Sequence, residues 1–414
     1  MVLISTGSMF ETLDSDDIEY FENFTGLELD VSAQNDSEDE EPPMCNFQVL
    51  RDGYKPIHGY LGLVVCILGT LFNLMNVLVL SHKDMRGNPI NLLLTGIAVA
   101  DVMVMLEYIP FVVHMNLLDE DSRPVEDKYS WGWGVFLWFH VNFTIIIHNV
   151  SIWLTLSLAI WRYIMIKHHV LAVTLCTIPR CKMLLLMGYI VPIILTIPNF
   201  LANSIQEQIQ PTDTGRNVTI YVLNWSSLAE SNNKLFYRLN IWFYSFFLKL
   251  VPCLVLTIFT GVLIRALYQV LNEAEEHSKR MKNGNTENKK STSTNTVPDN
   301  KVSKRRKHTN RTTRLLIVIL ILFLLTEFPQ GILLMTAVFA EEFFVDCYTP
   351  LGEMMDMMAL LNCSINFVLF CIMSVQFRTT FRKVIGYQEF MAKHFGNSNQ
   401  RAELEEIPLN SHKN

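Results

Sequence analysis

Seven apolar stretches, each long enough to cross a bilayer as a helix, constrain the fold of this 414-residue chain more than any other feature. A membrane helix needs about 20 consecutive, mainly apolar residues. The stretches cover about 59–81, 90–115, 134–165, 182–203, 239–268, 311–339 and 350–374. We therefore expect an all-α membrane protein that is built as a seven-transmembrane helix bundle.

The acidic and basic residues outside these stretches are segregated along the chain. Acids crowd the segment before the first span, whereas bases crowd the connection between the fifth and sixth spans, including the run 304–307. Loops rich in Lys and Arg remain in the cytoplasm. We therefore expect a multi-pass plasma membrane protein with its N-terminus outside. This rule and contact with the lipid bilayer explain the basic run, so we expect no nucleic acid partner.

The segments around the spans divide the chain into three parts. These are a disordered, acidic extracellular tail (1–54), the seven-transmembrane domain (55–385) and a cytoplasmic C-terminal tail (386–414). Within the domain, we expect 272–308 to be a flexible cytoplasmic loop and 204–236 a polar external loop. A short, basic, amphipathic helix is expected over Gln376–Ile385, on the inner membrane surface after the seventh span.

Cysteines and glycosylation sequons agree with this topology. Of the eight cysteines, only Cys45 and Cys347 fall on the expected outside, one before the first span and the other before the seventh. Those ends are neighbours in a ring of seven helices, and the exterior is oxidising, so we predict a disulfide between them. The sequons expected to carry glycans begin at Asn23, Asn35, Asn217 and Asn224.

Motifs in all seven spans resemble those of the rhodopsin-like G-protein-coupled receptors. The matching residues are Asn76 in the first span, Asn91 and Asp101 in the second, Arg162-Tyr163 in the third, Pro252 in the fifth, Pro329 in the sixth, and Asn362 and Asn366 in the seventh. The resemblance covers roughly residues 55–385. It implies a receptor that signals to a heterotrimeric G protein and is not an enzyme.

Departures from that family narrow the resemblance. Its Asp-Arg-Tyr is Trp161-Arg162-Tyr163 here, its Cys-Trp-x-Pro is the segment 326–329, and the usual cysteine at the outer end of the third span is absent. With TEFPQGI at 326–332 and DMMALLNCSINF at 356–367, the chain resembles the invertebrate branch of myosuppressin and sex peptide/myoinhibitory peptide receptors. The resemblance implies a ligand that is a short, C-terminally amidated neuropeptide, FMRFamide-like or myosuppressin-like, and coupling to Gi/o.

The resemblance assigns Arg162 and Tyr163 to G-protein coupling. His148 lies 14 residues before Arg162, nearly four helical turns, so both side chains share one face of the third span. The alternative is an arginine that snorkels to the interface. The acid that normally precedes this arginine is replaced by Trp161. No acid lies between Ser303 and Leu316. We therefore hypothesise weaker locking of the resting state.

Asp101 lies in the middle of the second span, where an acid needs a partner or an ion. The resemblance implies a sodium ion beside Asp101, with Asn76, Asn362 and Asn366 nearby. The alternative is a protonated or hydrogen-bonded structural acid. We expect no other cofactor, because no set of residues has convincing metal-ligand spacing.

Further polar residues inside the spans are candidates for ligand binding. They are Glu107, His140, Thr144, His148, Lys249, Glu327, Gln330 and Asp356. His140, Thr144 and His148 are spaced by four and form one polar stripe, although each is as readily a packed structural residue. Lys249 is expected to neutralise one acid as a buried ion pair. Lys249 alone cannot simply pair with Glu107, Glu327 and Asp356. We therefore expect Glu107 or Asp356 to bind the guanidinium of an arginine near the amidated end of the ligand.

The same residues allow other functions to be compared with this interpretation. One alternative is a chemosensory or orphan seven-helix receptor with a non-peptide ligand. A transporter or channel would use the intramembrane charges along a conduit. A retinal receptor would need a lysine in the seventh span, which has none over 350–376, and an amine receptor would carry an aspartate in place of Thr144. A membrane enzyme lacks an evident catalytic constellation.

Overall fold

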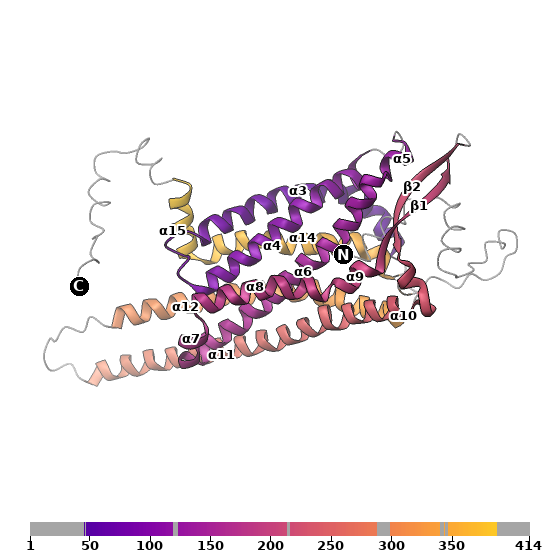
Figure 1. Cartoon of the computed structure of the whole chain (residues 1–414). Helices are drawn as coiled ribbons and strands as arrows, with labels where there is room; N and C mark the ends of the chain where they lie inside the picture. Colours follow the sequence, from indigo (N-terminus) through magenta and orange to yellow (C-terminus); the bar gives the residue numbers. More distant parts are fainter. Residues whose placement is uncertain are drawn as a thin grey trace.

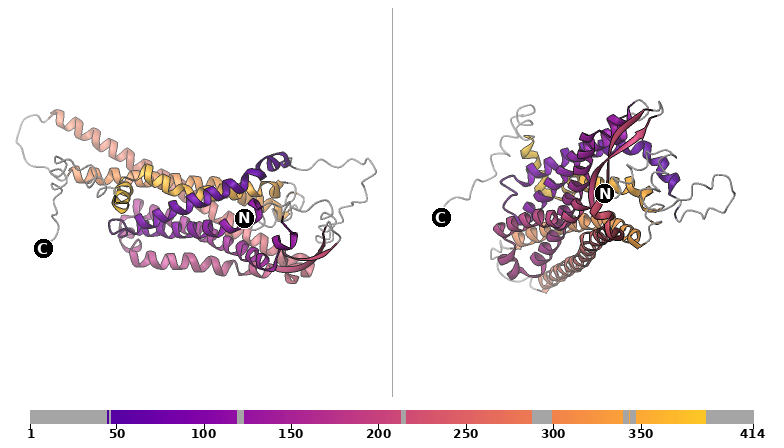
Figure 2. Two further views of the ribbon diagram at one scale, coloured as in Figure 1. Left: turned by 90° about the horizontal axis from the view of Figure 1, so that it is seen from above. Right: turned by 45° about the vertical axis from the view of Figure 1, so that its right-hand side comes forward.

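The computed structural model describes residues 45, 47–118, 123–212, 216–287, 299–339, 343 and 347–386. It confirms the predicted helix bundle: seven helices in these residues are long and apolar enough to cross a membrane. The spans are formed by α3 (Gln48–Leu80), α4 (Pro89–Val112) with η2 (Val113–Leu117), α6 (Trp131–Lys167), α8 (Ile178–Leu195) with α9 (Ile197–Ala202), α10 (Ser227–Phe243) with η3 (Tyr244–Leu250) and α11 (Val251–Glu287), α12 (Asp299–Phe339), and α14 (Gly352–Met373). They lie side by side as one bundle in Figures 1 and 2.

Three helices extend further than the hydropathy of the chain indicates. α3 begins at Gln48, well before the apolar stretch. α11 continues to Glu287 and α12 begins at Asp299, so most of 272–308, which we expected to be a loop, is helical. In Figure 1 these two helices project past the end of the bundle that carries α7 (His169–Leu175). A long polar stretch can continue a helix because backbone hydrogen bonds do not depend on apolar side chains.

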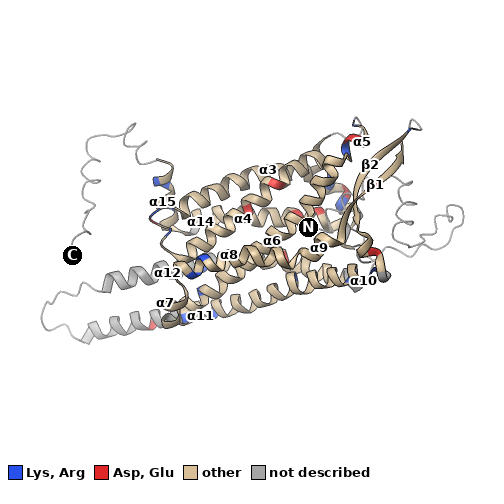
Figure 3. Ribbon diagram, viewed as in Figure 1, with Lys and Arg blue, Asp and Glu red and all other residues tan. Residues whose placement is uncertain are grey.

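The charged side chains mark the two ends of the bundle. In Figure 3 most Lys, Arg, Asp and Glu residues lie near these ends, and few lie along the middle of the helices. The polar residues that do lie in the middle are buried between helices, where lipid does not reach them. Ionisable groups at membrane depth are costly and therefore face the interior of a bundle or one another.

The fifth span is irregular at the depth where the polar residues gather. Its backbone forms a π-helical turn over η3, directly before Pro252. Proline lacks an N–H and clashes with the carbonyl four residues before it, so a regular α-helix is disturbed there. Lys249 lies in this turn, and its side chain is only 1% exposed.

A β-hairpin covers one end of the bundle, which we call the outer end because the sequence predicts that it faces outside; the opposite end, which carries α7, is called the inner end. β1 (Asn203–Pro211) and β2 (Asn217–Trp225) pair antiparallel, with Asn203 opposite Trp225 and Pro211 opposite Asn217. The segment 204–236, which we expected to be a polar external loop, therefore consists mostly of this hairpin and the start of α10. The hairpin is visible at the right-hand end in Figure 1.

The hairpin is attached to the third span without the usual disulfide. The amide of Tyr221 donates to the carbonyl of Tyr129 at 2.8 Å, close to α5 (Val125–Lys128). The indole N–H of Trp138 in α6 donates to the carbonyl of Asn203 in β1 at 3.3 Å. These bonds supply the constraint that a cysteine at the start of the third span would otherwise provide.

The predicted disulfide is present between Cys45 and Cys347, whose Cα atoms are 5.2 Å apart. It ties the segment before α3 to the turn before η5 (Thr349–Leu351) and α14. The first and seventh spans are therefore linked covalently at their outer ends. Tyr348, the neighbour of Cys347, is held in the interior at 1% exposure.

The predicted amphipathic helix is also present as α15 (Val375–Val384). The hydroxyl of Ser374 accepts from the amide of Phe377 and so caps its first turn. Phe377 is fully buried and stacks on Phe370 of α14. Residues 1–44, 46 and 387–414 lie outside the described part, together with most of both expected tails and the sequons at Asn23 and Asn35. The end of the expected disordered tail, from Gln48 to Tyr54, is helical instead, because α3 begins there.

Candidate functional site

Three charged or polar side chains from three spans meet in the middle of the bundle. Nζ of Lys249 lies 2.8 Å from Oε2 of Glu327 and 2.7 Å from Nε2 of His148. The same Glu327 oxygen lies 2.7 Å from that histidine nitrogen. η3, α12 and α6 are thereby joined through one buried cluster. We expected Lys249 to neutralise one of the three candidate acids, and the structure shows that this acid is Glu327.

The cluster continues outward through Gln330 on α12. The ammonium of Lys249 donates to Oε1 of Gln330 at 3.1 Å. The side chains of Gln330 and Tyr348 are hydrogen-bonded. A polar chain thus runs from Glu327 to Tyr348, which adjoins the disulfide at the outer surface. Each of its members is at most 4% exposed.

Glu107 belongs to a second polar cluster, between α4 and α6. Nδ1 of His140 lies 2.5 Å from Oε1 of Glu107, and the hydroxyl of Thr144 donates to Oε2 at 3.2 Å. Phe111 stacks on the imidazole of His140 with ring centres 4.1 Å apart. Both carboxylate oxygens of Glu107 are therefore engaged within the protein. A ligand guanidinium would have to replace these contacts, so ligand pairing by Glu107 stays a prediction.

Asp356 lies on α14, buried at 6% exposure, and interacts electrostatically with both His140 and Lys249. The ligand-binding candidates therefore all face the interior. They fall into the Glu107 cluster, the Lys249 cluster and Asp356. The helical spacing of the stripe on α6 is explained by these contacts, since His140 and Thr144 serve one cluster and His148 the other.

A cavity of about 20 Å³ lies outward of Lys249. It exceeds the roughly 10–15 Å³ that one water molecule requires. Its lining comes from the third to sixth spans, the end of β2 and Tyr348: Ile145, Asn199, Trp225, Asn240, Ile241, Tyr244, Lys249, Gln330, Leu334 and Tyr348. The amides of Asn199 and Asn240 bond to each other at 3.3 Å, and Asn199 donates to Asn142 of α6 at 3.0 Å. The cavity is therefore polar both at Asn199 and Asn240 and at Lys249 and Gln330.

Sequence reasoning missed these three asparagines. Asn142 lies inside the third span, and Asn199 and Asn240 stand near span ends, where polar residues are common. Polar residues at membrane depth are the one signal that could have singled them out. Their mutual contacts join α6, α9 and α10 and required the structure to find.

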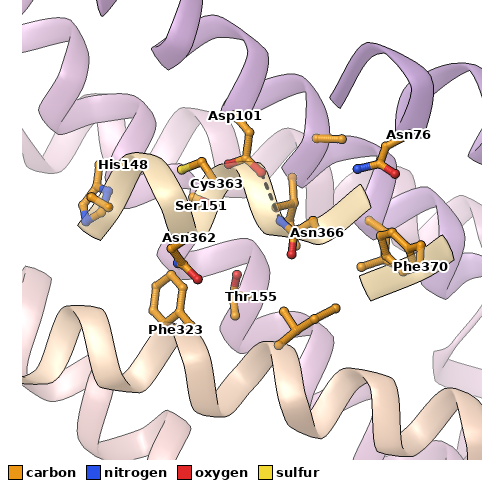
Figure 4. Close-up of a pocket in the computed structure, with 15 residues that line it drawn as sticks. Asn76, Asp101, His148, Ser151, Thr155, Phe323, Asn362, Cys363, Asn366 and Phe370 are labelled. Carbon is orange, nitrogen blue, oxygen red and sulfur yellow. Dashed lines mark hydrogen bonds between the residues drawn. The ribbon is translucent and has the colours of Figure 1, made fainter. Parts of the chain in front are cut away.

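A second cavity of about 30 Å³ surrounds Asp101 (Figure 4). Nδ2 of Asn366 donates to Oδ2 of Asp101 at 3.3 Å, and the side chains of Ser151 and Cys363 also hydrogen-bond to this carboxyl. Asn362 and Asn76 line the same cavity, although the amide of Asn76 donates to Asn73. Asp101 and its predicted asparagine neighbours are therefore brought together.

The groups around Asp101 fit a small hard cation. A carboxylate, a hydroxyl and amide oxygens are oxygen ligands of the kind that such ions prefer. The thiol of Cys363 is a soft group and adds no suitable ligand. The cavity also has room for the ion with a water molecule. Sodium binding at Asp101 therefore remains a proposal that these residues support.

Arg162 lies at the inner end of α6 with only 6% of its surface exposed. Tyr163 packs against His168 and Phe259, and its hydroxyl is 3.5 Å from Nε2 of His168. Between Arg162 and the Lys249 cluster lies an apolar layer shared by α6, α11 and α12. Its buried members are Ile152, Leu156, Ala159, Leu256, Leu263, Leu320 and Phe323. A movement of α12 at the inner end must rearrange this layer.

The two sequons on β2 differ in accessibility. The side chain of Asn217 is exposed at the start of the strand. Asn224 is 7% exposed, its Nδ2 donates to Gln206 at 3.0 Å, and its Oδ1 accepts from the amide of Trp225. A glycan would attach to Nδ2 of Asn224, which is buried and donates to Gln206. The structure therefore disfavours the predicted modification of Asn224 and is compatible with one at Asn217.

Comparisons with known proteins agree with this geometry. The family described as serpentine type 7TM GPCR chemoreceptor Srw matches residues 60–388. The chain is 29% identical to the G-protein coupled receptor dmsr-1 of Caenorhabditis elegans over 80% of this chain and 68% of that one. It is 27% identical to the sex peptide receptor of Drosophila melanogaster over 80% and 72%. It is 21% identical to the FMRFamide receptor of the same fly over 77% and 52%.

Proposed function

We propose that this chain, which belongs to the serpentine seven-transmembrane G-protein-coupled receptor family, is a plasma membrane receptor for short peptides with an amidated C-terminus. The names of two similar proteins, the sex peptide receptor and the FMRFamide receptor, support a peptide ligand. FMRFamide carries the amidated terminus in its name. The observation that carries the proposal is the cavity outward of Lys249, which is roofed by a hairpin and reaches the cluster that joins three spans.

The proposed receptor has its N-terminus outside and couples to a Gi/o protein at its inner end. The basic residues between the fifth and sixth spans support this orientation. Arg162 and Tyr163, at the cytoplasmic end of α6, are the residues proposed to contact the G protein. Because α12 contributes both Glu327 and part of the apolar layer, a ligand that alters the cluster biases the position of this helix.

The function is tested in cells that carry a Gi/o-responsive reporter. The cells express the chain and receive a panel of FMRFamide-like, myosuppressin-like and tryptophan-rich myoinhibitory peptides. We expect a saturable response to at least one amidated peptide. Arg162→Ala, at equal surface expression, is the control and should abolish that response. Silence across the panel, with promiscuous G proteins also supplied, would contradict a peptide ligand.

A second candidate is a receptor for a small non-peptide chemical, which the chemoreceptor description of the matching family favours. The same reporter cells distinguish the two. A response to small molecules with none to any peptide would favour this candidate. The lining of the cavity, with its phenols, amides and one ammonium, offers more hydrogen-bonding groups than a purely apolar odorant needs.

A further inference from the structure

Building on the proposed peptide-receptor function, we propose that the end of the cavity at Lys249 accepts the neutral C-terminal carboxamide of the ligand. In this arrangement the ligand carboxamide oxygen accepts from the Lys249 ammonium. Glu327 makes the same place reject a free carboxylate. The requirement for an amidated peptide would then originate in one buried ion pair.

The cavity itself limits which groups can reach Lys249. The cavity has a volume of only about 20 Å³. Among its described lining residues, Lys249 is the single charged side chain. An aromatic side chain does not fit such a space without movement of the walls, whereas a small polar end group does. The deepest polar group that an entering chain end meets is therefore the ammonium of Lys249.

The ammonium of Lys249 already has a full set of hydrogen-bond acceptors. A lysine ammonium donates at most three hydrogen bonds. Its neighbours are Oε2 of Glu327, Nε2 of His148 and the amide oxygen of Gln330, the last at the longest distance, 3.1 Å. A ligand carboxamide oxygen is chemically the same acceptor as that of Gln330. The ligand can therefore replace Gln330 with no change of charge.

The charges around Lys249 are already balanced. Lys249 and Glu327 form a pair in which the charges cancel, and both side chains are 1% exposed. Asp356 adds a further acid that interacts with Lys249. A second carboxylate on Lys249 would bring excess negative charge into a site that water hardly reaches, and such desolvated, uncompensated charge is costly. A carboxamide brings none.

Replacing Gln330 also connects binding to the helix that must move. Gln330 and Glu327 lie one turn apart on α12, and Gln330 is bonded to Tyr348 as well as to Lys249. When a ligand takes the Lys249 bond, α12 loses one of the two side-chain hydrogen bonds that join it to η3 in the described residues. This loosens the outer half of α12 relative to the fifth span.

The test uses the full-length chain and one active peptide in two forms, the carboxamide and the free acid. In the wild-type receptor the amide should be much more potent than the acid. Glu327→Gln removes the negative charge and keeps an oxygen that can face Lys249. We expect this variant to narrow the potency ratio between amide and acid by about tenfold or more, because the like-charge repulsion is gone.

The matched control is Glu107→Gln, the same substitution at another buried acid that also bonds a histidine. It should leave the ratio between amide and acid unchanged, whatever its effect on either potency. Narrowing by Glu107→Gln with none by Glu327→Gln would overturn the assignment to Lys249 and Glu327. Equal narrowing by both would also overturn it, since a general loss of negative potential would then explain the selectivity.

A third ligand form makes the test independent of whether a variant folds. The C-terminal methyl ester is neutral and keeps a carbonyl acceptor but lacks the amide N–H groups. On the wild-type receptor, the proposal predicts that the ester stays closer in potency to the amide than to the acid. An ester as weak as the acid would overturn it. A receptor that ignores all three forms contradicts the proposed function itself, and one that responds equally to all three contradicts only this inference.

Discussion

Nζ of Lys249 lies 2.8 Å from Oε2 of Glu327, and this contact joins the π-helical turn of the fifth span to the sixth span in the middle of the membrane. In the rhodopsin-like receptors that the sequence resembles, a tryptophan stands where Glu327 does here. The chain thus has an ion pair, supported by His148, next to the proline that bends α12. The first prediction concerns this pair.

Breaking the pair from one side should destabilise the receptor more than removing both charges. Lys249→Met and Glu327→Leu each leave an uncompensated buried charge, which costs about 3–5 kcal/mol in comparable pairs. The double variant removes both charges and should recover much of the loss. Thermal denaturation of the detergent-solubilised receptor measures this difference. A double variant as unstable as the sum of the single variants would contradict an energetic coupling between the two residues.

A sodium ion at Asp101 should weaken agonist action. A cation that binds the resting arrangement of the cavity stabilises that arrangement, so replacing external and internal potassium by sodium should lower agonist affinity severalfold. Asp101→Asn removes the charge and should abolish the sodium effect. Agonist competition binding on membranes in sodium or potassium buffer measures it. A sodium effect that persists in Asp101→Asn would place the ion elsewhere.

The attachment of α15 to the turn between α3 and α4 should withstand mild acid. The hydrogen bond from Lys383 to Asp84, 2.8 Å long, holds the pKa of this carboxyl below its ordinary value of 3.8, with help from the charges of Lys383, His82 and Lys83. Because the pKa of Asp84 is depressed, the contact is fully stabilising at any pH above the ordinary pKa. The stabilisation is lost only as the pH falls through the lowered pKa. The contact should therefore be unchanged between pH 7 and pH 5.

Distance measurements by electron paramagnetic resonance, with spin labels on α15 and on the turn after α3, check this prediction. Lys383→Gln should broaden the distance distribution at neutral pH. Arg382→Gln is the matched control, because Arg382 is an exposed neighbour for which the structure shows no bond to Asp84. If the distance distribution of the unaltered receptor broadened between pH 7 and pH 5, a histidine, not Asp84, would control the contact.

Of the two sequons on the hairpin, only Asn217 should carry a glycan. Its side chain is exposed, whereas the amide nitrogen of Asn224 is held by Gln206. Asn217→Gln should therefore increase the electrophoretic mobility of the receptor by the amount of one glycan, and Asn224→Gln should not change it. A mobility increase in Asn224→Gln would show that Asn224 carries a glycan, and it would contradict the contact between Asn224 and Gln206 at the time of modification.

The sequence predicted those parts of the fold that depend on hydropathy and charge. Burying apolar side chains in lipid determines the seven spans, and the amphipathic pattern around Phe377 and Phe381 determines α15. Two external cysteines at neighbouring helix ends indicated the disulfide. The hairpin was missed because the segment was interpreted by its polar composition. The alternation of Val218, Ile220 and Val222 on β2 was the available signal, and the first two are buried.

The site could be predicted only in part. The intramembrane position of Lys249 indicated an ion pair, but not its partner. Glu327 is 78 residues further along the chain, and only the packing of η3 against α12 determines which acid it meets. For the same reason the sequence could not show that Glu107 is held by His140 and Thr144. Spacing along one helix indicates a shared face, whereas contacts between helices depend on their relative rotation and depth.

The most direct test of the account measures nucleotide exchange on purified Gi/o protein by the receptor reconstituted in lipid vesicles. The account predicts that an active amidated peptide accelerates exchange in a saturable way, that its free acid is much weaker, and that Arg162→Ala removes the acceleration. Exchange that no peptide alters, together with a peptide- or solute-dependent ion flux through the same vesicles, would contradict it and favour a channel or transporter.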